Sequence, residues 1–323
     1  MITKNEPLFK RYENNPILIP EQWPYKINSV FNTAAVRLKD GKTLLFCRCE
    51  DMKGHSHLTK AISKDGISNW EIDEKPTFPP ELDNHPEELW GVEDPRVVFI
   101  PELNKYAVTY TAYSHAGPAV SLAMTEDFIT FERCGVIMPP EDKNSAMFPR
   151  KFGDQWALIH RPAGHQGSHI WISYSHDMLY WAHHKILLEA RNGGWWDAFK
   201  IGLGPPPIET PDGWLMIYHG VRMTGGGCLY RLGAALFDLE NPEICLLRGD
   251  NWIFGPQELY ERTGDVPNVV FSCGMTVQDD GDTIYMYYGA ADQCIGLAFG
   301  SVKRLLGWLK EKGRPPHETV EHY

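Results

Sequence analysis

Polar and charged side chains gather at the ends of the apolar segments of this 323-residue chain. Their types suit a bound anion, because lysine, arginine, histidine and tyrosine donate hydrogen bonds while carboxylates accept them or carry protons. The residues are Asn32, Arg48, Glu50, Asp51, Glu93, Asp94, Arg96, Lys143, Asn144, His160, Arg161, Lys200, Tyr218, His219, Tyr230 and Asp292. If the fold brings them to one face, they form a site for a small polar ligand with an anionic part.

These residues also have purely structural interpretations. The segment Glu93-Asp94-Pro95-Arg96 would make a turn with an internal ion pair, and Lys143 and Lys200 would be ordinary surface cations. Arg161 follows the apolar run ALIH, which favours a site over the open surface.

Two further groups have open interpretations. His55 and His57 fall on one side of a strand without a third ligand, so no metal is expected there. The tryptophans Trp90, Trp195 and Trp196 fit the apolar core and a sugar-stacking role equally well.

Hairpins are the elements that would position these residues. Five pairs of apolar runs are separated by turn residues, and Asp-Gly or Gly-Asp pairs are strong hairpin signals because they tolerate positive φ. The turns fall at Asp40-Gly41, Leu103-Asn104, Gly153-Asp154, Asp212-Gly213 and Gly281-Asp282. Their spacing of roughly 50–70 residues is typical of propeller blades.

A second element follows most of the hairpins, namely a turn with an aspartate and then an aromatic residue. It occurs at 63–70, 125–131 and 175–181, with a weaker copy at 235–242 and a remnant at 298–302. The alternation predicts an all-β fold, a five-bladed β-propeller with a short C-terminal helix. A large two-sheet β-sandwich is the alternative, but it gives no reason for the alternation.

The two ends of the chain carry separate expectations. Residues 1–30 are rich in proline and are expected to wrap around the edge of the fold. Within an extension over 301–323, a helix at 301–313 would place Val302, Leu305, Leu306 and Leu309 on one face. This helix would clasp the propeller or pack on another subunit, which leaves a homo-oligomer open. No linker interrupts the chain, so 1–323 is expected to be a single domain.

Composition excludes several classes of protein. The 31 Lys and Arg against 42 Asp and Glu give a net charge of −11, which argues against a nucleic-acid partner. Seven scattered cysteines favour reduced thiols, and the N-terminus lacks the apolar stretch of a signal peptide. No apolar run is long enough to span a membrane. We therefore expect a cytoplasmic protein without a membrane partner.

Five blocks of sequence stand in a characteristic order. They are WGVEDPRV (90–97), FPRKFGDQWALIHRP (148–162), FKIGLGPPPIETPDGWLMIYHGV (199–221), YRLGAALFDLENP (230–242) and DVPNVVFSCG with YYGAAD (265–292). In these blocks the chain resembles glycoside hydrolase family 130, which contains the β-mannoside phosphorylases. The resemblance extends from about Asn15 to Phe299 and also implies a five-bladed β-propeller.

The resemblance implies an activity. Terminal non-reducing β-mannosides, β-1,2- or β-1,4-linked, would be cleaved by inorganic phosphate with inversion, giving α-mannose 1-phosphate. The catalytic acid would be Asp94, acting through the mannose 3-hydroxyl as a proton relay. Phosphate would bind to Lys143, Arg161, Lys200, His219 and Tyr230. Asn32, Arg48 and Asp292 would lie near the mannosyl ring, and Asp51 and Asn144 are expected to join them in substrate binding.

The residue types agree with a site that has one catalytic acid and several cations for phosphate. Inverting hydrolysis needs a second carboxylate to activate water, whereas phosphate is already a nucleophile and needs cations to hold it. We therefore expect no metal and no cofactor apart from phosphate as co-substrate, and a His219 that is charged when phosphate is bound. The alternatives are a β-mannosidase of the same family and a non-catalytic carbohydrate-binding propeller. Arg150 departs from the family's usual glutamate, and we expect it to alter the acceptor side or a loop contact.

Overall fold

The computed structural model describes residues 6–164 and 168–316, and most of them lie in antiparallel β-strands. The helices within this part are α1 (Leu259–Arg262), α2 (Val302–Lys312) and the 3-10 turns η1 (Pro20–Gln22) and η2 (Pro86–Glu88). The strands are β1 (Lys10–Arg11), β2 (Ser29–Arg37), β3 (Thr43–Glu50), β4 (Ser56–Ser63), β5 (Glu71–Ile72), β6 (Gly91–Ile100), β7 (Lys105–Ser114), β8 (Gly117–Thr125), β9 (Glu132–Met138), β10 (Asp142–Met147), β11 (Trp156–Pro162), β12 (Ile170–Ser175), β13 (Ala182–Leu188), β14 (Lys200–Leu203), β15 (Ile208–Thr210), β16 (Gly213–Thr224), β17 (Gly227–Phe237), β18 (Cys245–Gly249), β19 (Val270–Val277), β20 (Thr283–Ala290), β21 (Cys294–Ser301) and β22 (Gly313–Arg314).

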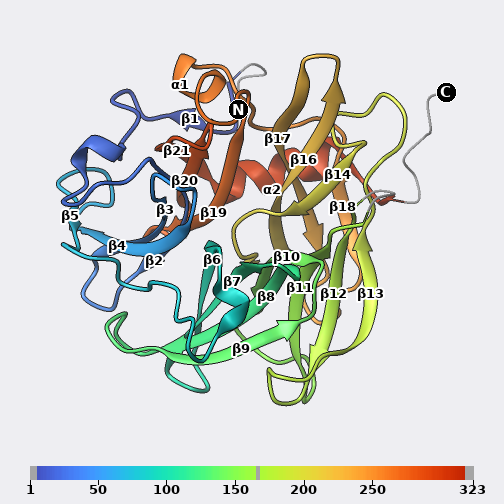
Figure 1. Ribbon diagram of the computed structural model, residues 1–323. Coiled ribbons are helices and arrows are strands. Elements are labelled where there is room, and N and C mark those ends of the chain that lie inside the picture. The colour runs from blue at the N-terminus through green and yellow to red at the C-terminus, as the bar shows by residue number, and fades with distance from the viewer. Residues whose placement is uncertain (1–5, 165–167, 317–323) are drawn as a thin grey trace.

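The strands fall into groups that follow one another around the molecule in chain order (Figure 1). Within the described residues the groups are β2–β5, β6–β9, β10–β13, β14–β18 with β22, and β19–β21 with β1. The first two groups are joined into one sheet by the parallel pair Ser56–Gly91. Each of the five hairpin turns predicted from Gly, Asp and Asn pairs lies between two paired strands.

The apolar core lies between neighbouring groups. One cluster joins Phe46 of the first group to Val108 of the second, and other clusters join the second to the third, the third to the fourth and the fourth to the fifth. A further cluster packs Leu45 of the first group against Leu297 of the fifth. The first and last groups are therefore also neighbours, which brings the first strand of each group toward the others.

The predicted aspartate turns have one geometry. Asp65, Asp127, Asp177 and Asp238 each accept hydrogen bonds from the backbone N–H groups two and three residues further along the chain. Such a carboxylate replaces backbone partners in a tight turn, which explains why aspartate recurs at this place in successive groups.

Three of the four bulges in first strands, those of β2, β6 and β10, share one feature, and the fourth lies in β19 between Phe271 and Gly274. The pairing register shifts between Phe31 and Ala34, between Glu93 and Arg96, and between Lys143 and Ala146. Each of these three bulges holds a residue with positive φ, namely Asn32 at 44°, Asp94 at 49° and Asn144 at 54°. Asn and Asp tolerate this left-handed conformation better than most residues, and bulges redirect side chains. The strand β6 also contacts the neighbouring first strands β2 and β10.

Both ends of the chain pack on the strands. The short β1 pairs with β21, so a segment of the predicted N-terminal wrap becomes the outer strand of the last group. Its Arg11 forms an ion pair with the buried Glu261. The helix α2 begins after Ser301, whose hydroxyl caps it, and buries Val302, Leu305, Leu306 and Leu309 as predicted. This face belongs to the core cluster between the fourth and fifth groups, so the helix clasps its own chain. No helix among the described residues is long and apolar enough to cross a membrane.

Candidate active site

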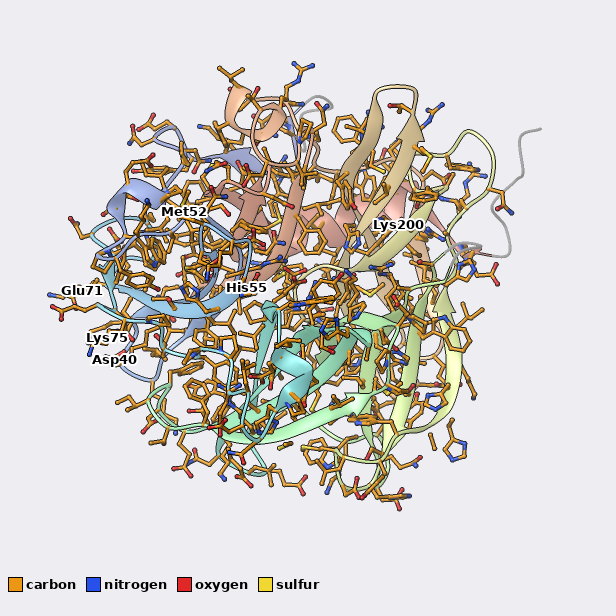
Figure 2. All side chains as sticks on the ribbon, viewed as in Figure 1. Asp40, Met52, His55, Glu71, Lys75 and Lys200 are labelled. Atoms are coloured by element: carbon orange, nitrogen blue, oxygen red, sulfur yellow. The ribbon has the colours of Figure 1, made fainter. Side chains whose placement is uncertain are left out.

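A cavity of about 460 Å³ lies among the first strands and the loops that adjoin them. Its wall includes Glu93, Tyr113, Lys143, Arg161, Phe199 and Lys200. These residues come from the second, third and fourth strand groups. Lys200 lies at the start of β14, at the cavity. The turn of the first hairpin, which contains Asp40, lies away from it at the periphery of the molecule (Figure 2). The cavity thus collects the predicted cations at one end of the strands.

Asp94 occupies the bulge of β6 and is 7% exposed. Its Oδ1 accepts hydrogen bonds from Asn32 Nδ2 and Arg48 Nη1, both at 2.9 Å. Burial favours a higher pKa for Asp94, but Arg48, Arg96 and the bond from Asn32 outweigh burial and hold the pKa below its ordinary value. The carboxyl is therefore ionised in the unliganded site.

Arg96 ties this bulge to the fourth strand group. Its guanidinium donates to the backbone oxygens of Leu203 and Gly204 at the end of β14, and to the backbone oxygen of Asp94. The side chain is 1% exposed. Arg96 therefore positions backbone and does not face the ligand.

Arg48 connects several carboxylates. Besides Asp94, it donates to Glu50 at 2.6 Å and to Glu93 at 3.0 Å. Burial raises the pKa of Glu93 despite the nearby Arg48. Burial also raises the pKa of Asp292 to about 7, with Asp94 and Glu50 adding repulsion that Arg48 only partly offsets. The neighbourhood of Asp94 thus contains two carboxyl groups that bind protons more readily than usual.

Three cations face the cavity without a direct ion pair among the described residues. Among residues 6–164 and 168–316, Lys143, Lys200 and the two terminal nitrogens of Arg161 have no hydrogen-bond or ion-pair partner. Burial lowers the pKa of Lys143, and attraction to Glu93 offsets this effect only in part. Burial also lowers the pKa of Lys200, and repulsion from Arg161 adds to the effect at both lysines. Arg161 is only 5% exposed. Buried cations of this kind are normally paired, so the arrangement is suited to an anionic ligand.

His219 and Tyr230 lie beside the cations. The His219 ring stacks near Tyr230 and Phe271, with centroids 6.2 Å and 4.6 Å away, and Lys200 Nζ lies 5.4 Å from the centre of the Tyr230 ring. A Cβ on Gly202 would stand 2.4 Å from His219 Cε1, so only glycine leaves room for this ring. Burial raises the pKa of Tyr230 to about 12, so its hydroxyl keeps its proton.

His219 is neutral in the unliganded site. Burial and the nearby Arg161, Arg96 and Lys200 lower the pKa of His219 well below its ordinary value. Its Nδ1 is buried without a partner among the described residues. The charge expected on His219 is therefore absent before phosphate binds, and the lysines and arginine carry the positive charge.

Most of the predicted site residues come together, with two exceptions. Asp51 uses its carboxylate to accept from the backbone N–H groups of Lys53 and His55, so it closes a turn and does not contact the cluster. Asn144 accepts from Arg161 Nε at 2.9 Å and is 2% exposed, so it holds a cation in place. In both cases the side chain already has a hydrogen-bond partner within the protein, which is local for Asp51 and on the paired strand for Asn144.

The remaining candidates lie elsewhere. Trp196 is buried, stacks on Tyr218 and donates to the backbone oxygen of Asp250, so it belongs to the core. Arg150 contacts Glu209 and Glu240 at a junction between the third and fourth groups, which makes the loop contact the better of its two interpretations. Among the described residues, no group of three or more His, Cys, Asp or Glu side chains is arranged to hold a metal ion.

The cavity wall also includes residues that sequence reasoning missed or did not assign. Glu93 faces the cavity beside Asp94, and Tyr113, Glu141 and Phe199 line its wall. Tyr113 ends β7 next to Trp90, whose ring lies 5.2 Å away. Exposed aromatic residues at strand ends are the signal that could have identified Tyr113 and Phe199, because such residues commonly contact ligands.

Comparisons with known proteins identify the family of the chain. Residues 3–311 match the family model of glycoside hydrolase family 130, described as beta-1,4-mannooligosaccharide phosphorylase. A 1,2-beta-oligomannan phosphorylase of Thermoanaerobacter sp. (strain X514) is 37% identical, over 91% of this chain and 97% of that protein. A beta-1,4-mannooligosaccharide phosphorylase of Ruminococcus albus is 36% identical, over 93% of this chain and 90% of its own.

Solved structures are similar as well. The beta-1,2-mannobiose phosphorylase of Listeria innocua, in complex with beta-1,2-mannobiose, superposes with a TM-score of 0.85 at 29% identity, covering 94% of this chain and 99% of that one. A structure described with glycoside hydrolases that target beta-1,2 mannosidic linkages in Candida mannan superposes with a TM-score of 0.81 at 25% identity, covering 94% and 96%. The match to the family model across the chain, together with these relatives, shows that the protein belongs to glycoside hydrolase family 130.

Proposed function

We propose that the protein is an inverting β-mannoside phosphorylase that uses inorganic phosphate as co-substrate. The substrate would be a terminal non-reducing β-mannoside, and the products would be α-mannose 1-phosphate and the shortened sugar. The observation that carries the proposal is the set of three cations, Lys143, Arg161 and Lys200, that line the cavity and have no ion-pair partner within residues 6–164 and 168–316. A neutral sugar alone gives no reason to bury them, whereas a phosphate dianion does.

The reaction requires one bond to form as another breaks. A phosphate oxygen, held by Arg161 and Lys200, attacks the anomeric carbon on the face opposite the leaving group. The bond from that carbon to the glycosidic oxygen breaks, and the leaving oxygen receives a proton from Asp94 through the mannose 3-hydroxyl. Arg48 and Asn32 fix the Asp94 carboxylate for this transfer.

Asp94 must first take up a proton, since its pKa is lowered in the free protein. A bound phosphate dianion raises the pKa of a nearby carboxyl, because a like charge disfavours the ionised form. Phosphate binding would thus both supply the nucleophile and prepare the acid. Asn32, Arg48 and Asp292 would surround the mannosyl ring, and His219 and Tyr230 would donate neutral hydrogen bonds to phosphate.

A five-bladed β-propeller over residues 1–323, as one domain, is the architecture that we propose for this site. Core clusters between successive strand groups, and between the last group and the first, support it. A two-sheet sandwich would have one core between its sheets. The seven cysteines are free thiols, which supports a reducing, cytoplasmic compartment.

Phosphate-dependent turnover tests the proposal. The protein would be incubated with β-1,2- and β-1,4-linked manno-oligosaccharides and with mannosyl-glucose, each with and without phosphate. We expect consumption of at least one of them only when phosphate is present. Equal release of free mannose with and without phosphate would favour the hydrolase, a candidate that the similarity to the mannosidase-associated structure brings forward. Binding of the sugars without turnover would favour the non-catalytic propeller.

A further inference from the structure

A row of polar side chains crosses the third strand group from the cavity side to the outer strand. Each strand of the group contributes one residue, namely Asp142 from β10, His160 from β11, Ser173 from β12 and His184 from β13. We call these four residues the polar rung. The four strands lie side by side in Figure 1, in green to yellow. Their other inward side chains are largely apolar, so the rung is a polar line through a hydrophobic sheet.

Hydrogen bonds connect the rung without a break. His160 Nδ1 lies 2.6 Å from Asp142 Oδ2, and His160 Nε2 lies 2.7 Å from Ser173 Oγ. Ser173 Oγ lies a further 2.7 Å from His184 Nδ1. One assignment of protons satisfies every atom of the row: His160 donates to Asp142, Ser173 donates to His160, and His184 donates to Ser173.

Burial makes the rung costly to interrupt. Asp142, His160 and Ser173 are 3%, 2% and 0% exposed, whereas His184 lies at the surface. A buried polar group that loses its partner cannot recover the lost bond from water. The position of the Asp142 carboxylate is therefore determined by His160.

Asp142, the rung residue on the cavity side, binds the backbone of Arg161, one of the proposed phosphate-binding cations. Asp142 Oδ1 accepts a hydrogen bond from the backbone N–H of Arg161 at 3.1 Å. Asp142 immediately precedes Lys143 and His160 immediately precedes Arg161, and Lys143 and Arg161 are directly paired across β10 and β11. The pair Asp142–His160 thus stands beside the ladder pair that carries two cations into the cavity.

The rung also adjoins the bulge of β10. The bulge begins after Lys143 and contains Asn144, whose Oδ1 accepts from Arg161 Nε. A left-handed residue in a strand persists only where its surroundings hold it. With Arg161 fixed at its backbone N–H and at Nε, only its two terminal nitrogens remain to bind an anion.

We propose that His160 is a positioning residue for phosphate, which orients Arg161 and Lys143 through Asp142 without touching the ligand. This inference rests on the proposed function, since phosphate must be the ligand of these cations. It predicts that a break in the rung weakens phosphate binding while the mannosyl side, built on the first, second and fifth strand groups, stays intact.

The test compares variants within the same strand group. His160→Gln and Ser173→Ala break the rung, and His176→Ala, an exposed histidine in the turn after β12, is the matched control. We expect the phosphate KM to rise about tenfold or more for His160→Gln and less for Ser173→Ala, with the mannoside KM within about twofold of wild type. Phosphate binding by calorimetry should weaken in parallel, and His176→Ala should match wild type.

Equal rises in both KM values, or unchanged phosphate binding in a folded His160→Gln, would overturn the inference. If His160→Gln fails to fold, Ser173→Ala decides by the same ratio, since it removes only one hydroxyl. The proposed function fails separately, in the wild type, if no β-mannoside is consumed in a phosphate-dependent manner. If the wild type turns over with phosphate but the variants keep its phosphate KM, the positioning role of His160 is wrong and the proposed function stands.

Discussion

Arg48 Nη1 and Asp94 Oδ1 lie 2.9 Å apart, on side chains that come from two different strand groups. The bond joins β3 to the bulge of β6. The other terminal nitrogen of Arg48, Nη2, donates hydrogen bonds to Glu50 and Glu93. A single guanidinium therefore holds the proposed acid in place and keeps it ionised until a ligand arrives. Asp94 lies in a bulge inside β6 and not in a turn, although it precedes a proline.

The first prediction concerns the proposed acid. Asp94→Asn should lower the turnover number by at least about one hundredfold, because an amide has no acidic proton and general acid catalysis contributes roughly 10²–10⁴-fold. The fold and phosphate binding should remain, since asparagine can still accept from Asn32 and Arg48. Steady-state kinetics and calorimetry with phosphate check this. Residual activity above one part in about one hundred would place the acid elsewhere.

The second prediction concerns the unpartnered cations. Arg161→Ala and Lys200→Ala should each raise the phosphate KM by about ten- to one hundredfold, since each removes a charge-assisted hydrogen bond of about 1.5–3 kcal/mol. The mannoside KM should change much less. Arg150→Ala is the control, because this arginine contacts Glu209 and Glu240 away from the cavity. Parallel rises in both constants would argue against a phosphate cradle.

The third prediction follows from the lowered pKa of the two lysines. A lysine with a lowered pKa loses its charge at a lower pH than an ordinary lysine, so anion affinity should weaken early as pH rises. Sulfate is the suitable probe because its own charge stays constant over this range. Inhibition by sulfate in wild type should decline as pH rises, and the decline should begin below the pH at which an ordinary lysine loses its charge. In Lys200→Arg the decline should move to higher pH, because arginine does not titrate there. An unchanged profile in this variant would exclude Lys200 as the titrating group.

The fourth prediction concerns Asp292, whose pKa is raised to about 7. Between about pH 4 and 7 the folded protein binds more protons at this group than the unfolded chain does, so its contribution lowers stability as pH rises. Asp292→Asn removes that pH-dependent cost. The stability difference between variant and wild type should therefore grow from pH 4 to pH 8 by at least about 1 kcal/mol. In a chain of this size that corresponds to a difference in Tm of roughly 2 °C. A difference that does not vary with pH would contradict the raised pKa.

The hairpins and the aspartate turns could be predicted because local chemistry determines them. Gly41, Gly153 and Gly281 all adopt positive φ in the turns where Asp-Gly or Gly-Asp pairs occur, and Asp65 and Asp127 cap turns through their own neighbours. The spacing of Val302, Leu305, Leu306 and Leu309 likewise predicts the buried face of α2. These features need no knowledge of distant residues.

The fine structure of the site depends on contacts between distant residues. Nothing in the sequence around Asn144 shows that its side chain accepts a hydrogen bond from Arg161 on the paired strand. The charge state of His219 depends on Arg161, Arg96 and Lys200, which reach it from other strands. The polar rung is equally hidden, because its four members are far apart in the chain and meet only when the strands pair.

The stereochemistry of the first product tests the central claim most directly. The protein would be mixed with β-1,2- or β-1,4-mannobiose and excess phosphate, and the products would be followed by ³¹P and ¹H NMR from the earliest time points. We expect α-mannose 1-phosphate in equal amount with free mannose, and no reaction when phosphate is omitted. Formation of β-mannose 1-phosphate, or release of mannose alone at a rate independent of phosphate, would contradict this claim.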